Sequence, residues 1–252
     1  MGGPVGNGGF AGRMWILAAA LLVADWAASG ESHRNLEGVW RLASPQAAFR
    51  PADGGQIPFT GEGRKEYEQN KASAAQGDYS FDPTQSRCSS PGLPRVMLTP
   101  MLVKIYQRPH LVAMLFEWNR LFREVIMNDG PKMKNPMQEG IATGGGEDVG
   151  TQIGTTTGHW EGKTLVAETG KFSEAKLLDN FIPNSADLQI TEHIRLIDEN
   201  TLQDRITITD PQYFVRPWDA TLTYTRQADN LYPFREDVCL ERKRAGGLPL
   251  PH

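Results

Sequence analysis

The sequence predicts a mainly antiparallel all-β domain, closed as a barrel or packed as a sandwich, with one N-terminal helix. From residue 102 onward, short segments alternate apolar and polar residues, as half-buried strands do. Most of these segments are separated by short breaks such as Glu161-Gly162, and hairpin connections favour antiparallel pairing. Only Gly63–Ala75 has the Glu, Lys, Gln and Ala content of a helix, and one helix is too few for a doubly wound sheet.

The first strand is expected at Leu36–Leu42, followed by a Pro- and Gly-containing loop, the helix, and an irregular stretch over residues 76–100. Further strands are predicted at Leu102–Gln107, Leu111–Trp118, Leu121–Met127, Thr155–Trp160, Lys163–Thr169, Leu188–Ile197, Thr201–Thr209, Ala220–Arg226 and Glu236–Arg242. Residues 131–150 are expected to form a Gly-rich loop. The run Gly144–Gly146 within it follows no strand and opens no helix, so it does not match a phosphate-binding loop.

Length and charge narrow the class of protein. The 252 residues suit one domain, expected over residues 31–242, with a flexible tail at residues 243–252. The net charge is −4 and the basic residues are spread along the chain, which does not favour nucleic acid. The sequence has no Gly-x-Ser-x-Gly elbow, His-Glu-x-x-His helix or Asp-rich calcium loop, so serine-hydrolase and metal chemistry are not expected and no cofactor is predicted.

The N-terminal segment resembles a signal peptide over residues 1–30. Arg13 precedes the apolar run Met14–Val23, and small residues follow at Ala27–Gly30. The run is shorter than the ~18 residues that a membrane span needs, so no stable span is expected. The interpretation predicts a periplasmic or secreted protein; a buried N-terminal helix is the alternative.

The chain contains two cysteines, Cys88 and Cys239. In an oxidising compartment such a pair can form a disulfide. Spacing alone does not show that they meet, so two buried thiols remain the alternative. Two distant cysteines without a His cluster do not make a zinc site.

Glu192 interrupts an apolar face and is the most informative residue of the chain. One face of its predicted strand is otherwise aliphatic and reads Leu188, Ile190, Glu192, Ile194 and Leu196. An unpaired buried charge is costly, so such a carboxylate is expected to be paired, protonated or used in function.

Neighbouring strands repeat this pattern with one polar residue in each apolar row: Glu117 after Leu111, Ala113 and Leu115; Arg123 between Leu121 and Val125; Asp204 between Leu202 and Ile206; Tyr224 after Ala220 and Leu222. If these rows line one interior, Glu192 is a candidate general acid or base there, and Arg123 or Tyr224 would stabilise an oxyanion. The alternative is structural pairing, in which Arg123 keeps Glu192 ionised. Trp218 belongs to an aromatic loop at the barrel rim, where core packing and ligand contact are both open.

Several motifs resemble a family of uncharacterised exported bacterial proteins. The most specific is Gly158-His-Trp-Glu-Gly-Lys-Thr-Leu-Val166, and further pieces in matching order include Cys88–Arg95, Phe116–Arg123 and Ser185–Glu192. The resemblance covers roughly residues 85–242 and implies export and a β-rich, lipocalin-like barrel. This chain departs from the family pattern where relatives carry histidines, reading Gly154-Thr-Thr-Thr-Gly158 and Asn184 instead. Thr155 and Asn184 are therefore expected to mark a divergent pocket.

Three functional hypotheses follow. The first is a β-barrel that binds a small apolar or amphipathic molecule in an internal pocket, with ligand contacts from Glu117, Thr155, Asn184, Asp204 and Trp218. The second is a cofactor-independent lyase, isomerase or hydratase in which Glu192 moves the proton. The third is a structural or interaction protein whose interior is filled. A large cavity beside Glu192 favours the first two, and a filled core with Glu192 bound to Arg123 favours the third.

Overall fold

The computed structural model describes residues 1–4, 6, 35–128, 151–173, 176–228 and 236–250. The expected Gly-rich loop and nearly all of the expected signal peptide lie outside these residues. Among the helices that are described, none has the length and apolar character needed to cross a membrane.

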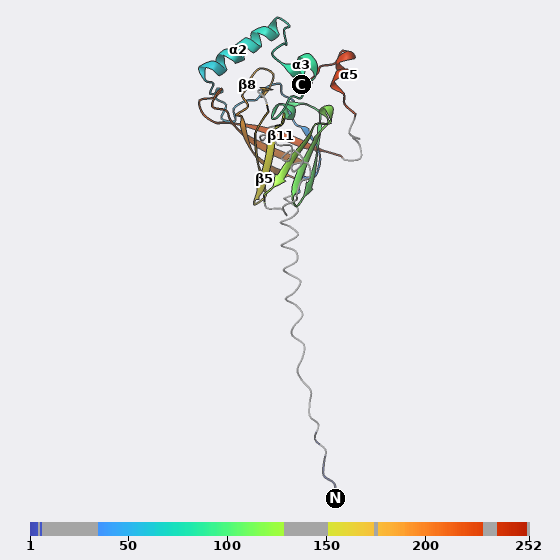
Figure 1. Cartoon of the computed structure of the whole chain (residues 1–252). Coiled ribbons are helices and arrows are strands. Elements are labelled where there is room, and N and C mark those ends of the chain that lie inside the picture. The colour runs from blue at the N-terminus through green and yellow to red at the C-terminus, as the bar shows by residue number, and fades with distance from the viewer. Residues whose placement is uncertain (5, 7–34, 129–150, 174–175, 229–235, 251–252) are drawn as a thin grey trace, which may run out of the picture. The chain divides into compact units, whose positions relative to one another are not determined.

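The described residues form a closed barrel of nine strands, which confirms the predicted all-β class (Figure 1). Around the barrel the order is β1 (Gly38–Leu42), β11 (Trp218–Gln227), β10 (Thr201–Thr209), β9 (Gln189–Asp198), β6 (Thr164–Gly170), β5 (Thr155–Glu161), β4 (Phe122–Met127), β3 (Leu111–Phe116) and β2 (Leu102–Arg108). Neighbouring strands pair antiparallel, except that β4 and β5 are parallel. Closure leaves the barrel without an unpaired sheet edge.

Short helices and a two-stranded ribbon gather at one end of the barrel (Figure 1). They are α2 (Gly61–Ala75), α3 (Pro83–Arg87), α5 (Cys239–Arg244), and the strands β7 (Lys176–Leu177) and β8 (Pro183–Asn184). The side chain of Thr60 caps α2 by accepting from the Gly63 amide, and Asp82 caps α3, with Pro83 in its first turn. Gly63 lets α2 approach the Tyr213 carbonyl, where a Cβ atom would clash.

The predicted strand at Glu236–Arg242 is wrong, because Cys239–Arg244 form helix α5. The run Leu-Glu-Arg-Lys-Arg consists of good helix formers and lacks a consistent period of two. Its N-terminal residue is held by a disulfide between Cys88 and Cys239, whose Cα atoms are 5.8 Å apart. The disulfide was one of the two alternatives that the spacing left open.

Part of the expected tail packs against the rest of the chain. Within residues 243–250, Leu250 is only 1% exposed. The Trp118 indole Nε1 donates to the Pro249 carbonyl oxygen at 2.8 Å, and Arg242 donates to the same oxygen at 2.7 Å. Buried apolar surface and these hydrogen bonds hold the segment against the rest of the chain.

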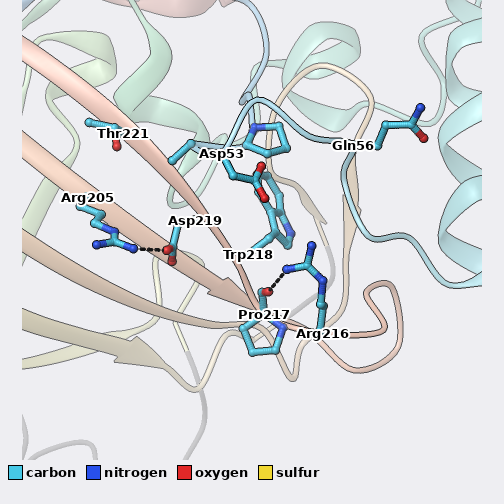
Figure 2. Close-up of a pocket in the computed structure, with 10 residues that line it drawn as sticks. Asp53, Gln56, Arg205, Arg216, Pro217, Trp218, Asp219 and Thr221 are labelled. Atoms are coloured by element: carbon cyan, nitrogen blue, oxygen red, sulfur yellow. Dashed lines mark hydrogen bonds and ion pairs between the residues drawn. The ribbon is translucent and has the colours of Figure 1, made fainter.

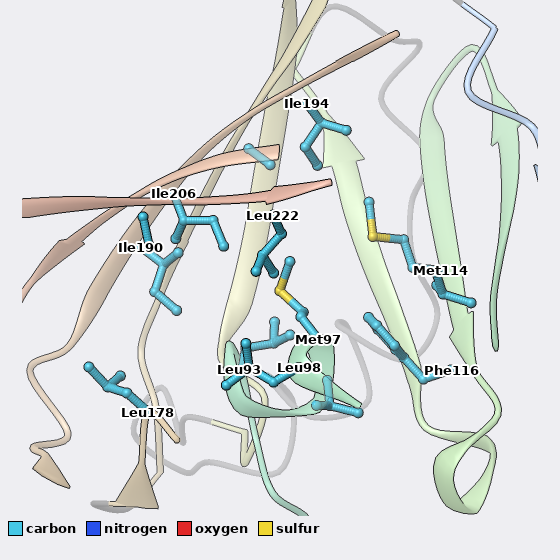
Figure 3. Packing of buried hydrophobic residues seen from close by; sticks show 14 of the residues in the cluster. Leu93, Met97, Leu98, Met114, Phe116, Leu178, Ile190, Ile194, Ile206 and Leu222 are labelled. Carbon is cyan, nitrogen blue, oxygen red and sulfur yellow. The ribbon is translucent and has the colours of Figure 1, made fainter. Parts of the chain in front are cut away.

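The barrel interior is filled by aliphatic side chains and by a short segment that enters from the helical end. Residues Arg95–Leu98 form a 3-10 turn, and Leu93, Met97 and Leu98 pack against Ile190, Ile206 and Leu222 of the strands (Figure 3). Because these side chains are nearly inaccessible to solvent, the 93–98 segment acts as a plug in the barrel.

The inward row of β3 differs from the prediction. Val112, Met114 and Phe116 are buried, whereas Leu111 and Leu115 are only half-buried, so the row that was expected to end in Glu117 faces the other way. The strand Leu-Val-Ala-Met-Leu-Phe is apolar at every position, so the sequence does not show which alternate set of side chains faces the interior. Cross-strand pairing of Met114 with Arg123 sets the inward face instead.

Candidate functional site

Arg123 and Glu192 form a buried ion pair inside the barrel, each with a side chain that is 1% exposed. Arg123 Nη1 donates to Glu192 Oε1 at 2.9 Å, and Nη2 donates to Oε2. Two threonines complete the guanidinium shell: Thr169 Oγ1 accepts from Nη2 at 3.0 Å, and Thr156 Oγ1 lies 3.4 Å from Nε. Burial lowers the pKa of Arg123, but the charge of Glu192, its hydrogen bonds, and the nearby Asp204 and Tyr224 together outweigh burial and raise the pKa. Glu192 is therefore held as the counter-ion of a permanent cation.

Asp204 lies beside this pair and is 1% exposed. Burial raises the pKa of Asp204 well above its usual value, and the negative charge of Glu192 raises it further, while Arg123 opposes the shift. When Asp204 is protonated, the three side chains Arg123, Glu192 and Asp204 carry one positive and one negative charge and are neutral overall. A neutral set has the lowest desolvation cost in an apolar interior. Tyr224, whose hydroxyl lies 3.3 Å from the Met97 carbonyl oxygen, faces the same group from β11.

The free space beside these side chains is small. Asp204 and Tyr224 line a cavity of about 20 Å³, which also touches Met97 of the plug. A volume of this size accommodates about one water molecule, whereas ligand pockets take roughly 300 Å³ or more. The interior is therefore filled around the Arg123–Glu192 pair, which is the outcome that favours the third hypothesis, and a ligand would need a site outside this interior.

Two other predicted residues lie apart from the interior group. Glu117 follows the end of β3, where its Oε2 accepts from the Leu102 amide at 3.0 Å. Thr155 is exposed and its neighbour Thr156 is buried, so Thr155 does not line the interior. The Thr-Thr-Thr run shows no alternation, so the sequence did not mark which of these threonines is buried.

Asn184 lines a different pocket, of about 150 Å³, at the helical end of the barrel. Its walls come from α2, α3, the plug, β7 and β8, and they combine apolar and polar side chains: Glu66, Asn70, Phe81, Asp82, Pro83, Thr84, Pro91, Arg95, Leu177 and Asn184. Asn184 is held in place by its neighbour, since the Ser185 amide and hydroxyl both donate to the Asp210 carboxylate, at 2.6 and 3.0 Å.

A second buried ion pair forms one side of this pocket. Arg95 Nη1 and Nη2 donate to the two carboxylate oxygens of Asp82 at 2.9 and 2.6 Å, and Nη2 also lies 3.2 Å from Asn180 Oδ1. Both charged side chains are at most 2% exposed. Asp82 also caps α3 through the amides of Thr84 and Gln85, so the pair joins the plug to that helix.

Two polar atoms of the pocket residues have no hydrogen-bond partner within the described ranges, namely Asn184 Oδ1 and Arg95 Nε. Asn184 uses only its Nδ2, which donates to the Ser185 carbonyl oxygen at 2.9 Å. A buried acceptor or donor without a partner costs on the order of 1–3 kcal/mol. A ligand that supplied both partners would recover that cost.

The sequence interpretation missed Asp82 and Arg95. The run Asp82-Pro83-Thr84 is a helix-start signal and was available, since Asp favours the cap position and Pro the first turn. Arg95 lies in an irregular stretch without periodicity, so no sequence pattern marks it as buried. Among the residues that the structure describes, no group of three or more His, Cys, Asp or Glu side chains is placed to hold a metal ion.

No protein-family model matches this chain, and no curated protein matches it either.

Proposed function

We propose that this protein is an exported β-barrel protein that binds a small amphipathic molecule in the pocket lined by Asn184 and Arg95. The unpaired Asn184 Oδ1 and Arg95 Nε are the observation that carries the proposal. Both residues line one pocket, and an unpaired acceptor together with an unpaired donor calls for a ligand with an N–H or O–H group beside a carbonyl.

The size and walls of the pocket define the ligand further. A cavity near 150 Å³ holds a six-membered ring such as benzene. Phe81, Pro91 and Leu177 supply apolar contacts around the two polar groups. These features fit a small ring or short chain with one apolar face and one amide-like edge.

The barrel interior has a supporting role in this proposal. The packed Arg123–Glu192 pair makes the wall rigid, and the plug carries Arg95 from the interior to the pocket. Export is supported by the signal-peptide pattern and by the Cys88–Cys239 disulfide, which persists in oxidising compartments.

The proposal is tested with 2-piperidinone, a ring that carries a carbonyl next to an N–H, and with its N-methyl derivative, which lacks the N–H. Saturation-transfer NMR on the purified protein is expected to detect binding of 2-piperidinone and much weaker binding of the N-methyl ring. Asn184→Leu keeps a similar volume without the acceptor and is expected to abolish the difference between the two rings. Asn200→Leu makes the same change at an exposed turn and serves as the control. If neither ring binds, or if Asn184→Leu retains the preference, the proposed site is wrong.

A further inference from the structure

A second pocket, of about 600 Å³, lies on the outer side of the barrel, between the loop of residues 51–56 and the strands β10 and β11 (Figure 2). Its volume falls within the roughly 300–1,000 Å³ of small-ligand sites. The Ala52 amide donates to the Asp219 carbonyl oxygen at 2.7 Å, and the Val215 amide donates to the Pro58 carbonyl oxygen at 2.9 Å. Because the loop is tied to β11 and to the segment before it, the pocket is built into the fold.

Two opposite charges face this pocket from different segments. Asp53 belongs to the loop, where its Oδ1 accepts from the Gly55 amide at 2.8 Å. Arg216 precedes β11, and its Nη1 lies 3.4 Å from the Pro217 carbonyl oxygen. No ion pair joins Asp53 to Arg216 in the described chain, whereas Arg205 and Asp219, which line the same pocket, are paired with one another. The charges of Asp53 and Arg216 are therefore available to pair with a ligand.

Apolar side chains line the pocket together with these charges. They include Trp218, which is 4% exposed, and the rings of Pro51 and Pro217. Figure 2 shows the side chains of Asp53 and Arg216 reaching toward the Trp218 indole. The indole Nε1 is buried without an acceptor among the residues described.

We propose that this outer pocket binds a small zwitterion of the amino-acid class. The ligand carboxylate pairs with the planar guanidinium of Arg216, which suits two-point contact, and the ligand ammonium pairs with Asp53. An apolar side chain then lies along Trp218 and the prolines. A simple anion would also meet the carboxylates of Asp53 and Asp219, and a simple amine would meet two guanidinium groups, so only separated opposite charges match the pocket. The site shares no residue with the pocket at Asn184 and stands independently of it.

Isothermal titration of the full chain, with its disulfide intact, tests this with three probes. L-leucine carries both charges, N-acetyl-L-leucine lacks the ammonium, and L-leucinamide lacks the carboxylate. Leucine is expected to bind at least about tenfold more tightly than either derivative, since each charge-assisted contact is lost in turn.

Variants assign the two ends of the ligand. Arg216→Gln is expected to weaken the binding of leucine and N-acetyl-leucine and to leave the binding of leucinamide unchanged. Asp53→Asn is expected to weaken the binding of leucine and leucinamide and to leave the binding of N-acetyl-leucine unchanged. Arg195→Gln removes an exposed arginine of β9 that does not line the pocket and is the matched control. Both pocket charges are at exposed positions, so unchanged thermal unfolding midpoints will show that the variants are folded. Absence of leucine binding, equal affinity for the three probes, or insensitivity to both variants overturns the proposal.

Discussion

Replacing Glu192 by Gln isolates the energetic role of the buried ion pair. The substitution keeps the shape of the side chain but removes the counter-charge of Arg123, whose side chain is 1% exposed. Thr156 and Thr169 still contact the guanidinium, so hydrogen bonds remain but the charge is uncompensated. Removing one partner of a buried pair costs about 3–5 kcal/mol, a large part of the ~5–15 kcal/mol that holds a typical domain folded.

Asp204 makes this loss depend on pH. The charge of Glu192 is one cause of its raised pKa, so Glu192→Gln lowers that pKa and lets Asp204 ionise in the field of Arg123. The loss of stability is therefore expected to be larger at low pH, where Asp204 is protonated, and smaller at higher pH, where ionised Asp204 takes over as the counter-charge.

Urea unfolding followed by tryptophan fluorescence and far-UV circular dichroism measures the change, provided that the two probes coincide. Glu168→Gln, on the exposed face of β6, is the control and is expected to change stability by less than about 0.5 kcal/mol. The double variant Arg123→Met with Glu192→Gln removes both charges and is expected to be more stable than Glu192→Gln alone. A loss below about 1 kcal/mol, or a double variant no better than the single one, would refute the reasoning that water is excluded from this pair.

Three further predictions concern groups that hold the fold. Asp204→Asn is expected to remove a pH dependence of the free energy of unfolding. Because the folded-state pKa of Asp204 is raised, the stability from its protonated form is complete below the unfolded pKa near about 3.9 and is lost as pH rises toward the folded pKa, by about 1.4 kcal/mol per pH unit. Urea unfolding that gives the wild type and the variant the same dependence of stability on pH would contradict this. Replacing Cys88 and Cys239 by Ala opens a loop of 151 residues and is expected to cost up to about 5 kcal/mol in the chain-entropy account, measured as a lower unfolding midpoint that matches the reduced wild type. Asp82→Asn removes the carboxylate that is paired with buried Arg95 and is expected to cost about 3–5 kcal/mol by the same assay, whereas a change within experimental error would show that water reaches this pair.

Most strands were predictable because they alternate apolar and polar residues over their own length. β9 and β10 lie within one residue of their expected bounds, and Glu192 and Asp204 face inward as the alternation predicted. Prediction was wrong where alternation is absent. The all-apolar β3 carries two possible inward rows, and the charged run at α5 was mistaken for a strand although its composition favours a helix.

The sequence by itself determined the β class, the polar residues placed in apolar rows, and the pair of cysteines able to bond, because each depends on local spacing or composition. Only the tertiary structure decided that the plug around Met97 fills the interior, that Asp82 meets Arg95, and that Asn184 borders a pocket. Those contacts join segments far apart in the chain. Their formation depends on how the closed barrel and its helical end pack together, and no local periodicity carries that information.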